Sequence, residues 1–204
     1  VQLNGGTGEA NAIVDGTHRL ASGAQLNADT VFTGTGNLTV AGPLTSSGDF
    51  GLVKDGTGTL RLTAANTYTG DTTVRSGTLA LSGAGNLGAS PNLRIDTGGT
   101  LDVSALPSGY TLSAQQLTLD GDVVGDLNAT AASTVHVNSA NSLNGSLSLD
   151  ASLATGGGRI TGSLASANGS TVRVGGDGIG ALSPSASAGI VTSNLTLNFD
   201  AALD

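Results

Sequence analysis

Short runs in which apolar and polar residues alternate recur along the chain, and the clearest lie between Gly51 and Gly88. In TLRLT, TTV and TLALS of this stretch, leucine, valine or threonine recurs at every second position. Such alternation over about four to six residues is typical of half-buried strands. Turn-forming sequences such as DGTG, NTYTG and RSG separate the runs, and no helix-forming stretch intervenes. Each strand is too short to bury an apolar side alone, so the pattern predicts a chain that coils and stacks flat rungs.

The same alternation predicts strands on both sides of this stretch. Before it, they are expected at Ala12–Val14, His18–Ala21, Asp29–Phe32 and Asn37–Val40. After it, they are expected at or around Leu93–Ile95, Leu101–Val103, Tyr110–Leu112, Leu117–Leu119, Val123–Val124, Leu127, Val135–Val137, Leu147–Leu149, Arg159–Ile160, Leu164, Val172–Val174, Ile190–Val191, Leu195–Leu197 and Phe199. A bend is expected at Pro43 and a turn at Pro107-Ser108-Gly109.

The spacing of the apolar runs indicates a repeat. Leu60 and Leu79 are 19 residues apart, Leu79 and Leu101 are 22 apart, and Leu101 and Leu117 are 16 apart. The interval from Leu117 to Val135 is 18 residues, and that from Val172 to Leu195 is 23. A loose period near 20 is typical of a solenoid.

We therefore predict an all-β fold, a right-handed, single-stranded parallel β-helix of about ten coils of roughly 20 residues. With strands about 4.8 Å apart, the rod would be roughly 50 Å long. Residues 1–204 are expected to form one continuous domain. The abrupt character of both ends, with an uncapped strand at the C-terminal one, favours a fragment of a longer chain.

Composition agrees with a narrow solenoid core and limits the partners. Of 204 residues 33 are glycine, while aromatic residues make up 2% and charged residues 11%. The formal net charge is −8 and the seven basic residues are scattered, so we expect no nucleic-acid partner. The chain has no cysteine, which excludes disulfides and zinc–thiolate sites. Because no apolar run approaches about 20 residues, we expect no membrane insertion by this segment.

From Lys54 to Leu81 the sequence resembles the autotransporter-associated β-strand repeat of bacterial autotransporter passenger domains. The residues that carry the resemblance are Lys54, Gly56, Gly58, Leu60, Leu62, Asn66, Tyr68, Gly70, Thr72, Val74, Gly77, Leu79 and Leu81. The resemblance implies a right-handed β-helix displayed outside a Gram-negative-type cell, usually within a long protein. It thus implies an extracellular or cell-surface location.

The motif also has a direct physical interpretation. Its glycines, Gly56, Gly58, Gly70 and Gly77, permit positive φ or tight corners. Its leucines and Val74 are expected to fill the interior. Asn66 can bond to backbone at a corner and stack in a ladder. Tyr68 is expected to pack over a turn rather than bind a ligand.

Catalytic chemistry has few candidates in this chain. Glycoside hydrolysis needs two carboxylates about 5–9.5 Å apart, and Asp120, Asp122 and Asp126 in LDGDVVGDL are the best candidates. The favoured interpretation is a turn with solvated acids. His136 alternates with two valines and is expected on the exposed surface, and His18 lies about six coils away, so neither predicts a triad or a transition-metal site.

Ligand-binding motifs are equally weak. Gly5–Ile13 and Gly175–Leu182 each match a calcium-binding nonapeptide in part, but not in tandem. No phosphate-binding loop occurs, and the Thr-x-Thr sequences at Thr57–Thr59 and Thr67–Thr69 do not recur at a fixed period. We therefore expect no catalytic, metal or cofactor-binding residues.

The expected function is structural and non-catalytic: a stalk, fibre or adhesin scaffold of a secreted or surface-displayed bacterial protein. Its expected partners are neighbouring coils or other copies of the chain, which could form a filament, and cell-surface or polysaccharide contacts. The alternative is a polysaccharide-binding or polysaccharide-degrading β-helix.

Overall fold

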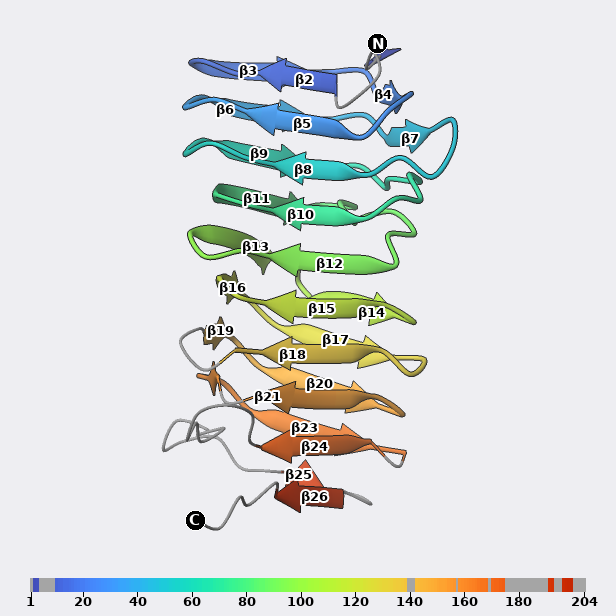
Figure 1. Cartoon of the computed structure of the whole chain (residues 1–204), viewed down its shortest axis with the longest axis vertical. Coiled ribbons are helices and arrows are strands. Elements are labelled where there is room, and N and C mark those ends of the chain that lie inside the picture. The colour runs from blue at the N-terminus through green and yellow to red at the C-terminus, as the bar shows by residue number, and fades with distance from the viewer. Residues whose placement is uncertain are drawn as a thin grey trace.

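The chain winds into a parallel β-solenoid, seen as a stack of flat rungs in Figure 1. This computed structural model describes residues 2–3, 10–138, 142–156, 158–168, 170–174, 191–192 and 196–199. Within them every regular element is a strand, and every strand pair is parallel. None of these segments forms an apolar helix of membrane-spanning length. The prediction of an all-β parallel solenoid is confirmed.

The longest sheet, the front sheet, collects one strand from each successive coil. In stacking order its strands are β2 (Ala10–Ile13), β5 (Thr30–Thr33), β8 (Leu52–Lys54), β10 (Thr72–Val74), β12 (Asn92–Ile95), β15 (Gln116–Leu119), β18 (Thr134–Val137), β21 (Leu153–Gly156), β24 (Thr171–Val174) and β26 (Thr196–Phe199).

A second sheet, the back sheet, takes the strand that follows each front strand from β2 to β21 after a short corner. It holds β3 (Thr17–Leu20), β6 (Asn37–Val40), β9 (Thr59–Leu62), β11 (Gly77–Ser82), β13 (Gly99–Ala105), β16 (Asp122–Val124), β19 (Ser142–Asn144) and β22 (Arg159–Ile160). Its eight strands correspond to about eight turns of the solenoid. The expected right-handed sense of the coil stays a prediction.

The third side of the coil is built from two separate sheets. The upper side sheet contains β1 (Gln2–Leu3), β4 (Ala24–Leu26) and β7 (Leu44–Ser46). The lower side sheet contains β14 (Tyr110–Ser113), β17 (Leu127–Thr130), β20 (Leu147–Asp150), β23 (Leu164–Ala167) and β25 (Val191–Thr192). Between them, residues 63–71 and 83–91 cross the third side without a strand. The two coils that contain the family motif therefore have strands on only two of their three sides, and we call them two-sided in this sense.

Alternation along each strand sends apolar side chains into one continuous core. Leu60, Leu79 and Leu101 lie in register on successive coils of the back sheet, and each is at most 1% exposed. Leu117 and Val135 stack in the same way in the front sheet. Aliphatic side chains make up most of this narrow core, and Phe32, Tyr68 and Tyr110 are its buried aromatic residues. The predicted interior role of the motif leucines and Val74 is confirmed.

The predicted repeat is right for most intervals and wrong for one. Leu101 pairs with Leu79 and Val123 in the back sheet, whereas Leu117 pairs with Leu93 in the front sheet. The interval from Leu101 to Leu117 therefore joins two sides of the coil. Each coil carries two or three apolar strands, so neighbouring runs are not always one coil apart.

A second predicted interval was also inexact. Val172 pairs with Leu197, two positions beyond the predicted Leu195, which lies outside the described residues.

Candidate functional site

The corner between β8 and β9 holds a buried lysine of the family motif. Lys54 is 3% exposed and occupies an inward position between Phe32 and Val74 in the register of the front sheet. Its ammonium Nζ donates to the carbonyl oxygens of Asp55 at 2.6 Å, Gly56 at 2.8 Å and Ser76 at 3.2 Å. All three N–H groups thus have acceptors. Because Ser76 belongs to the next coil, the lysine ties two coils together.

Electrostatics at this corner follow from the same contacts. Burial lowers the pKa of the Lys54 ammonium, while the Asp55 carboxylate opposes that shift. The Ser76 hydroxyl donates to Asp55 Oδ1 at 2.8 Å and the Gly56 N–H donates to it at 2.7 Å. These bonds lower the pKa of Asp55, with smaller contributions from Arg75 and Lys54. The corner is a closed set of mutually satisfied groups. Sequence reasoning missed it, because a lysine at a strand end usually faces solvent.

Asparagines close the third side where the side sheets are interrupted. Asn66 Oδ1 accepts the N–H of Leu44 at 2.8 Å, one coil above. One coil below, Asn86 Oδ1 accepts the N–H of Asn66 at 2.7 Å, and Asn66 Nδ2 donates to the Asn86 carbonyl at 2.6 Å. The predicted bonding of Asn66 to backbone is confirmed, and Asn66 and Asn86, which link three successive coils in this way, are called the asparagine ladder below. Side-chain amides here satisfy backbone groups that a strand would satisfy elsewhere.

Tyr68 corrects a prediction, because it does not pack over a turn. It is 0% exposed and fills the core on the side that lacks a strand. Its hydroxyl and that of Thr72 are hydrogen-bonded at 2.8 Å. Burial raises the pKa of Tyr68, and the bond to Thr72 partly opposes the shift. With no strand to supply inward leucines, one large side chain occupies that space.

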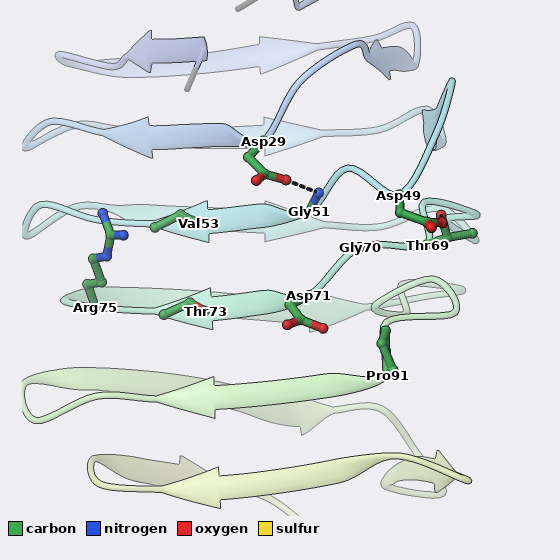
Figure 2. Close-up of a pocket in the computed structure, with 10 residues that line it drawn as sticks. All are labelled: Asp29, Asp49, Gly51, Val53, Thr69, Gly70, Asp71, Thr73, Arg75 and Pro91. Carbon is green, nitrogen blue, oxygen red and sulfur yellow. Dashed lines mark hydrogen bonds between the residues drawn. The ribbon is translucent and has the colours of Figure 1, made fainter. Parts of the chain in front are cut away.

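A groove with a volume of about 580 Å³ opens on the outside of these coils. Asp29, Gly51 and Asp71 lie in register on three successive coils at its acidic end (Figure 2). Val53 and Thr73 line it along the front sheet, and Arg75, Asp49, Thr69, Gly70 and Pro91 complete the lining.

Each carboxylate of the groove has one oxygen fixed. The Gly51 N–H donates to Asp29 Oδ1 at 2.8 Å, and the Thr69 hydroxyl donates to Asp49 Oδ1 at 3.0 Å. Asn92 Nδ2 donates to Asp71 Oδ1 at 2.9 Å. A Cβ on Gly51 would lie 2.2 Å from the Asp71 carbonyl oxygen, so the hollow between the acids requires glycine. The acids hold the loops in place.

The acids that the sequence offers as a catalytic pair lie at and beyond the bend between β15 and β16. Asp120 and Gly121 form the bend between β15 and β16, as the turn interpretation predicted. Asp120 is not a freely solvated acid, however: its side chain is 21% exposed, and Arg94 Nη2 lies 2.5 Å from Asp120 Oδ2. Asn138 Nδ2 donates to Asp120 Oδ1. Asp126 Oδ1 accepts the Ser146 N–H at 2.7 Å and so holds the next coil.

The two histidines remain apart, at the N-terminal coil and in β18. His136 points outward as predicted, but it is half-buried rather than fully exposed. Its Nδ1 lies 2.6 Å from Thr155 Oγ1 and its Nε2 lies 2.8 Å from Asn138 Oδ1. Hydroxyl, imidazole and amide in this order also occur in nucleophilic enzymes, but none of the three lines the groove. His18 is exposed, and its Nε2 donates to the Asp15 carbonyl at 2.5 Å.

Ligand-binding motifs gain no support from the described part of the chain. Most of Gly5–Ile13 and all of Gly175–Leu182 lie outside the described residues. Among the residues that are described, no three His, Cys, Asp or Glu side chains lie close enough to hold a metal ion. The polar groups described above mainly bond to the backbone or side chains of their own and adjacent coils.

Fold and corners together define a β-solenoid repeat protein whose family motif builds two-sided coils. Residues 52–81 match the model of the passenger-associated-transport-repeat. The chain carries this repeat of autotransporter passengers, and the resemblance predicted from Lys54–Leu81 is confirmed.

The chain is also similar to a much longer curated protein, the adhesin BmaC autotransporter of Brucella suis biovar 1 (strain 1330). The two are 35% identical over 150 residues, which cover 69% of this chain and 4% of that relative. The chain thus spans a small fraction of the relative's length. No solved structure matches it.

Proposed function

We propose that this chain is a structural, non-catalytic module of a surface-displayed bacterial protein. It is one continuous domain over residues 1–204, about ten right-handed coils, and serves as a stalk or adhesin scaffold. The observation that carries this proposal is the use of the motif's polar groups. Lys54 and Asn66 bond to the backbone of their own and adjacent coils, which stiffens the stack. The family repeat and the similarity to a long adhesin autotransporter support an extracellular, cell-surface location in a Gram-negative-type cell.

A replacement experiment tests the spacer role. In the protein that carries this chain, the chain is exchanged for an unrelated β-solenoid of equal length, and adhesion of the bacteria to surfaces is measured. A spacer can be replaced, so we expect adhesion to be retained when length is retained and to fall when the coils are deleted. Loss of adhesion in the equal-length replacement, with surface display unchanged, would show that this chain itself makes the contact.

Self-association is a separate proposal. A solenoid presents backbone edges at the ends of its stack, so copies can add head to tail. Sedimentation of the surface protein and electron micrographs test this: filaments or a concentration-dependent increase in mass support it. A monomer at all concentrations rules it out.

The groove on the front sheet favours one second candidate, a polysaccharide-binding surface. Fixed carboxylates at Asp29, Asp49 and Asp71 can accept hydrogen bonds from sugar hydroxyls. The two tyrosines are buried, so the described residues offer no tyrosine on which a sugar ring could stack. Asp71→Asn with Asp102→Asn as a control outside the groove, tested on a polysaccharide array, distinguishes the two functions. Binding that only Asp71→Asn weakens would establish the second.

A further inference from the structure

A connected series of polar side chains crosses four coils on the outer face of the front sheet. Arg94, Thr118, His136 and Thr155 lie in register on β12, β15, β18 and β21. Of these, Arg94 and His136 are linked through Asp120 and Asn138, the residues just beyond the ends of β15 and β18. Neither the family motif nor the lining of the groove includes any of these residues, although Pro91 of the groove directly precedes β12.

One end of this polar series is held by an ion pair. Arg94 Nη2 lies 2.5 Å from Asp120 Oδ2, and Arg94 Nε donates to Asp96 Oδ1 at 2.5 Å. An ionised carboxylate only accepts hydrogen bonds. Asn138 must therefore present its NH₂ group to Asp120 Oδ1, which leaves the amide oxygen of Asn138 facing His136.

The direction of every remaining bond follows from this anchor. Because Asn138 Oδ1 can only accept, the proton of the bond to His136 lies on Nε2, at 2.8 Å. In the neutral ring, Nδ1 is then an acceptor, and the Thr155 hydroxyl donates to it at 2.6 Å. The donors thus all point toward Asp120, from Thr155 through His136 and Asn138. Bonds aligned in this way polarise and strengthen one another.

We propose that Asp120 sets the direction of a hydrogen-bond relay that fixes His136 as the Nε2–H tautomer and couples the coils of β12, β15, β18 and β21. The relay is a conformational device in the fold. It suits the proposed stalk role, because it adds side-chain bonds between successive rungs to those of the backbone, but it does not depend on that role.

Nitrogen-15 NMR of the histidine rings, at alkaline pH where imidazole is neutral, tests the relay directly. In the wild-type chain we expect His136 to carry its proton on Nε2. In Asp120→Asn the anchor can donate as well as accept, so we expect a mixture of His136 tautomers. His18 serves as an internal reference, because its bond is to the Asp15 carbonyl and its signals should not change. An Nδ1–H ring in the wild type, or an unchanged ring in Asp120→Asn, would overturn the proposal.

A second pair of variants separates coupling from a local contact. Thr155→Val removes the last donor, and Thr118→Val makes the same change in the same outward column outside the relay. We expect Thr155→Val to keep the Nε2–H tautomer and to raise amide hydrogen exchange in β18 and β21 roughly three- to tenfold, with a smaller rise reaching β15. Thr118→Val should change neither. A rise confined to β21, or the same rise in Thr118→Val, would contradict coupling between the coils.

The NMR and hydrogen-exchange measurements test the relay independently of the replacement experiment that tests the stalk function. The stalk function can fail while the tautomer of His136 is as proposed, and the relay can fail while an equal-length solenoid still supports adhesion.

Discussion

The coils of the family motif and the coils below them close each turn of the backbone with different residues. Around residues 52–91 the coil is two-sided, and Lys54 together with the asparagine ladder satisfies the backbone at the corners. From β14 onward the coil is three-sided, and the buried serines Ser133, Ser152 and Ser170 cap the corners before β18, β21 and β24.

The two regions also differ in how the backbone reverses. In the motif coils, glycines occupy the tight positions: Gly56 and Gly77 have φ of +73° and +67°. In the lower coils glycines with positive φ still occur, such as Gly125, but alanines also adopt the left-handed region, with φ of +55° at Ala131 and +46° at Ala151. Alanine is disfavoured there by about 1–2 kcal/mol. The lower region therefore carries local strain that its third strand and serine bonds offset, whereas the motif coils avoid strain and depend on the absence of side chains.

The largest loss of stability is expected at a motif glycine that has no room for a Cβ atom. A Cβ on Gly58 would lie 1.8 Å from the Gly36 carbonyl oxygen, so Gly58→Ala should cost about 3 kcal/mol or more in the free energy of unfolding. Gly98→Ala is the control, because Gly98 has φ of +90° and nothing within 4 Å of the added Cβ. It should cost only about 1–2 kcal/mol of backbone strain. Urea unfolding measures both, and equal costs would show that close approach does not govern the motif corner.

The next effect concerns the buried lysine. Lys54→Met keeps the length of the side chain but leaves three carbonyls without their donor, so we expect a loss of about 2–3 kcal/mol. Arg61→Met on β9 removes a half-exposed cation from an outward position and should cost less than about 0.5 kcal/mol. If the two variants had the same urea midpoint, Lys54 would have no special role at the corner.

Acid should weaken the same corner through Asp55. Its folded-state pKa is lowered, so its contribution to stability is present above the unfolded pKa and is lost as pH falls below about 4. Unfolding midpoints measured between pH 6 and pH 3 should fall more steeply for the wild type than for Asp55→Asn. Parallel curves would mean that Asp55 has the same pKa in both states. Lys54 acts at alkaline pH instead. Because its pKa is lower in the folded state than in the unfolded state, its contribution to the free energy of unfolding should increase as pH rises toward the unfolded-state pKa.

The smallest expected effect is a gain in stability from a substitution in the lower coils. Ala131→Gly relieves the left-handed φ at an exposed corner and should stabilise the chain by up to about 1 kcal/mol. Ala129→Gly, on the buried side of the adjacent strand β17, is the control and should destabilise. A loss of stability in Ala131→Gly would show that this corner carries no strain.

Much of the fold could be predicted because strands with two inward leucines, such as Leu60 and Leu62 in β9, show the alternation plainly. Strands such as β7 and β19 were missed, since Leu44 and Leu143 are the single inward apolar residue of each. The strand β8 was also missed, because Lys54 is a charged residue at an inward position and interrupts the alternation.

The contacts between coils could be predicted only in part. The asparagine at position 66 suggested a ladder, since its residue type bonds to backbone in turns. The link from His136 to Asp120 could not be predicted, because it depends on which residues the register places on adjacent rungs. A register between coils of 18 to 24 residues cannot be fixed from spacing alone.

Removal of one whole coil tests most directly whether the chain is a stack of equivalent structural rungs. Deleting residues 115–132 joins Ala114 to Ser133, so that Ala114 takes the place of Ala132, its equivalent one coil on, because Gln116 pairs with Thr134. Both junction corners have a left-handed alanine, at φ of +54° for Ala114 and +61° for Ala132. We predict that this chain keeps its strand signal in circular dichroism and a cooperative unfolding transition, whereas deletion of residues 115–123, half a coil, abolishes both. Loss of folding in the whole-coil deletion, or equal tolerance of both deletions, would contradict the account.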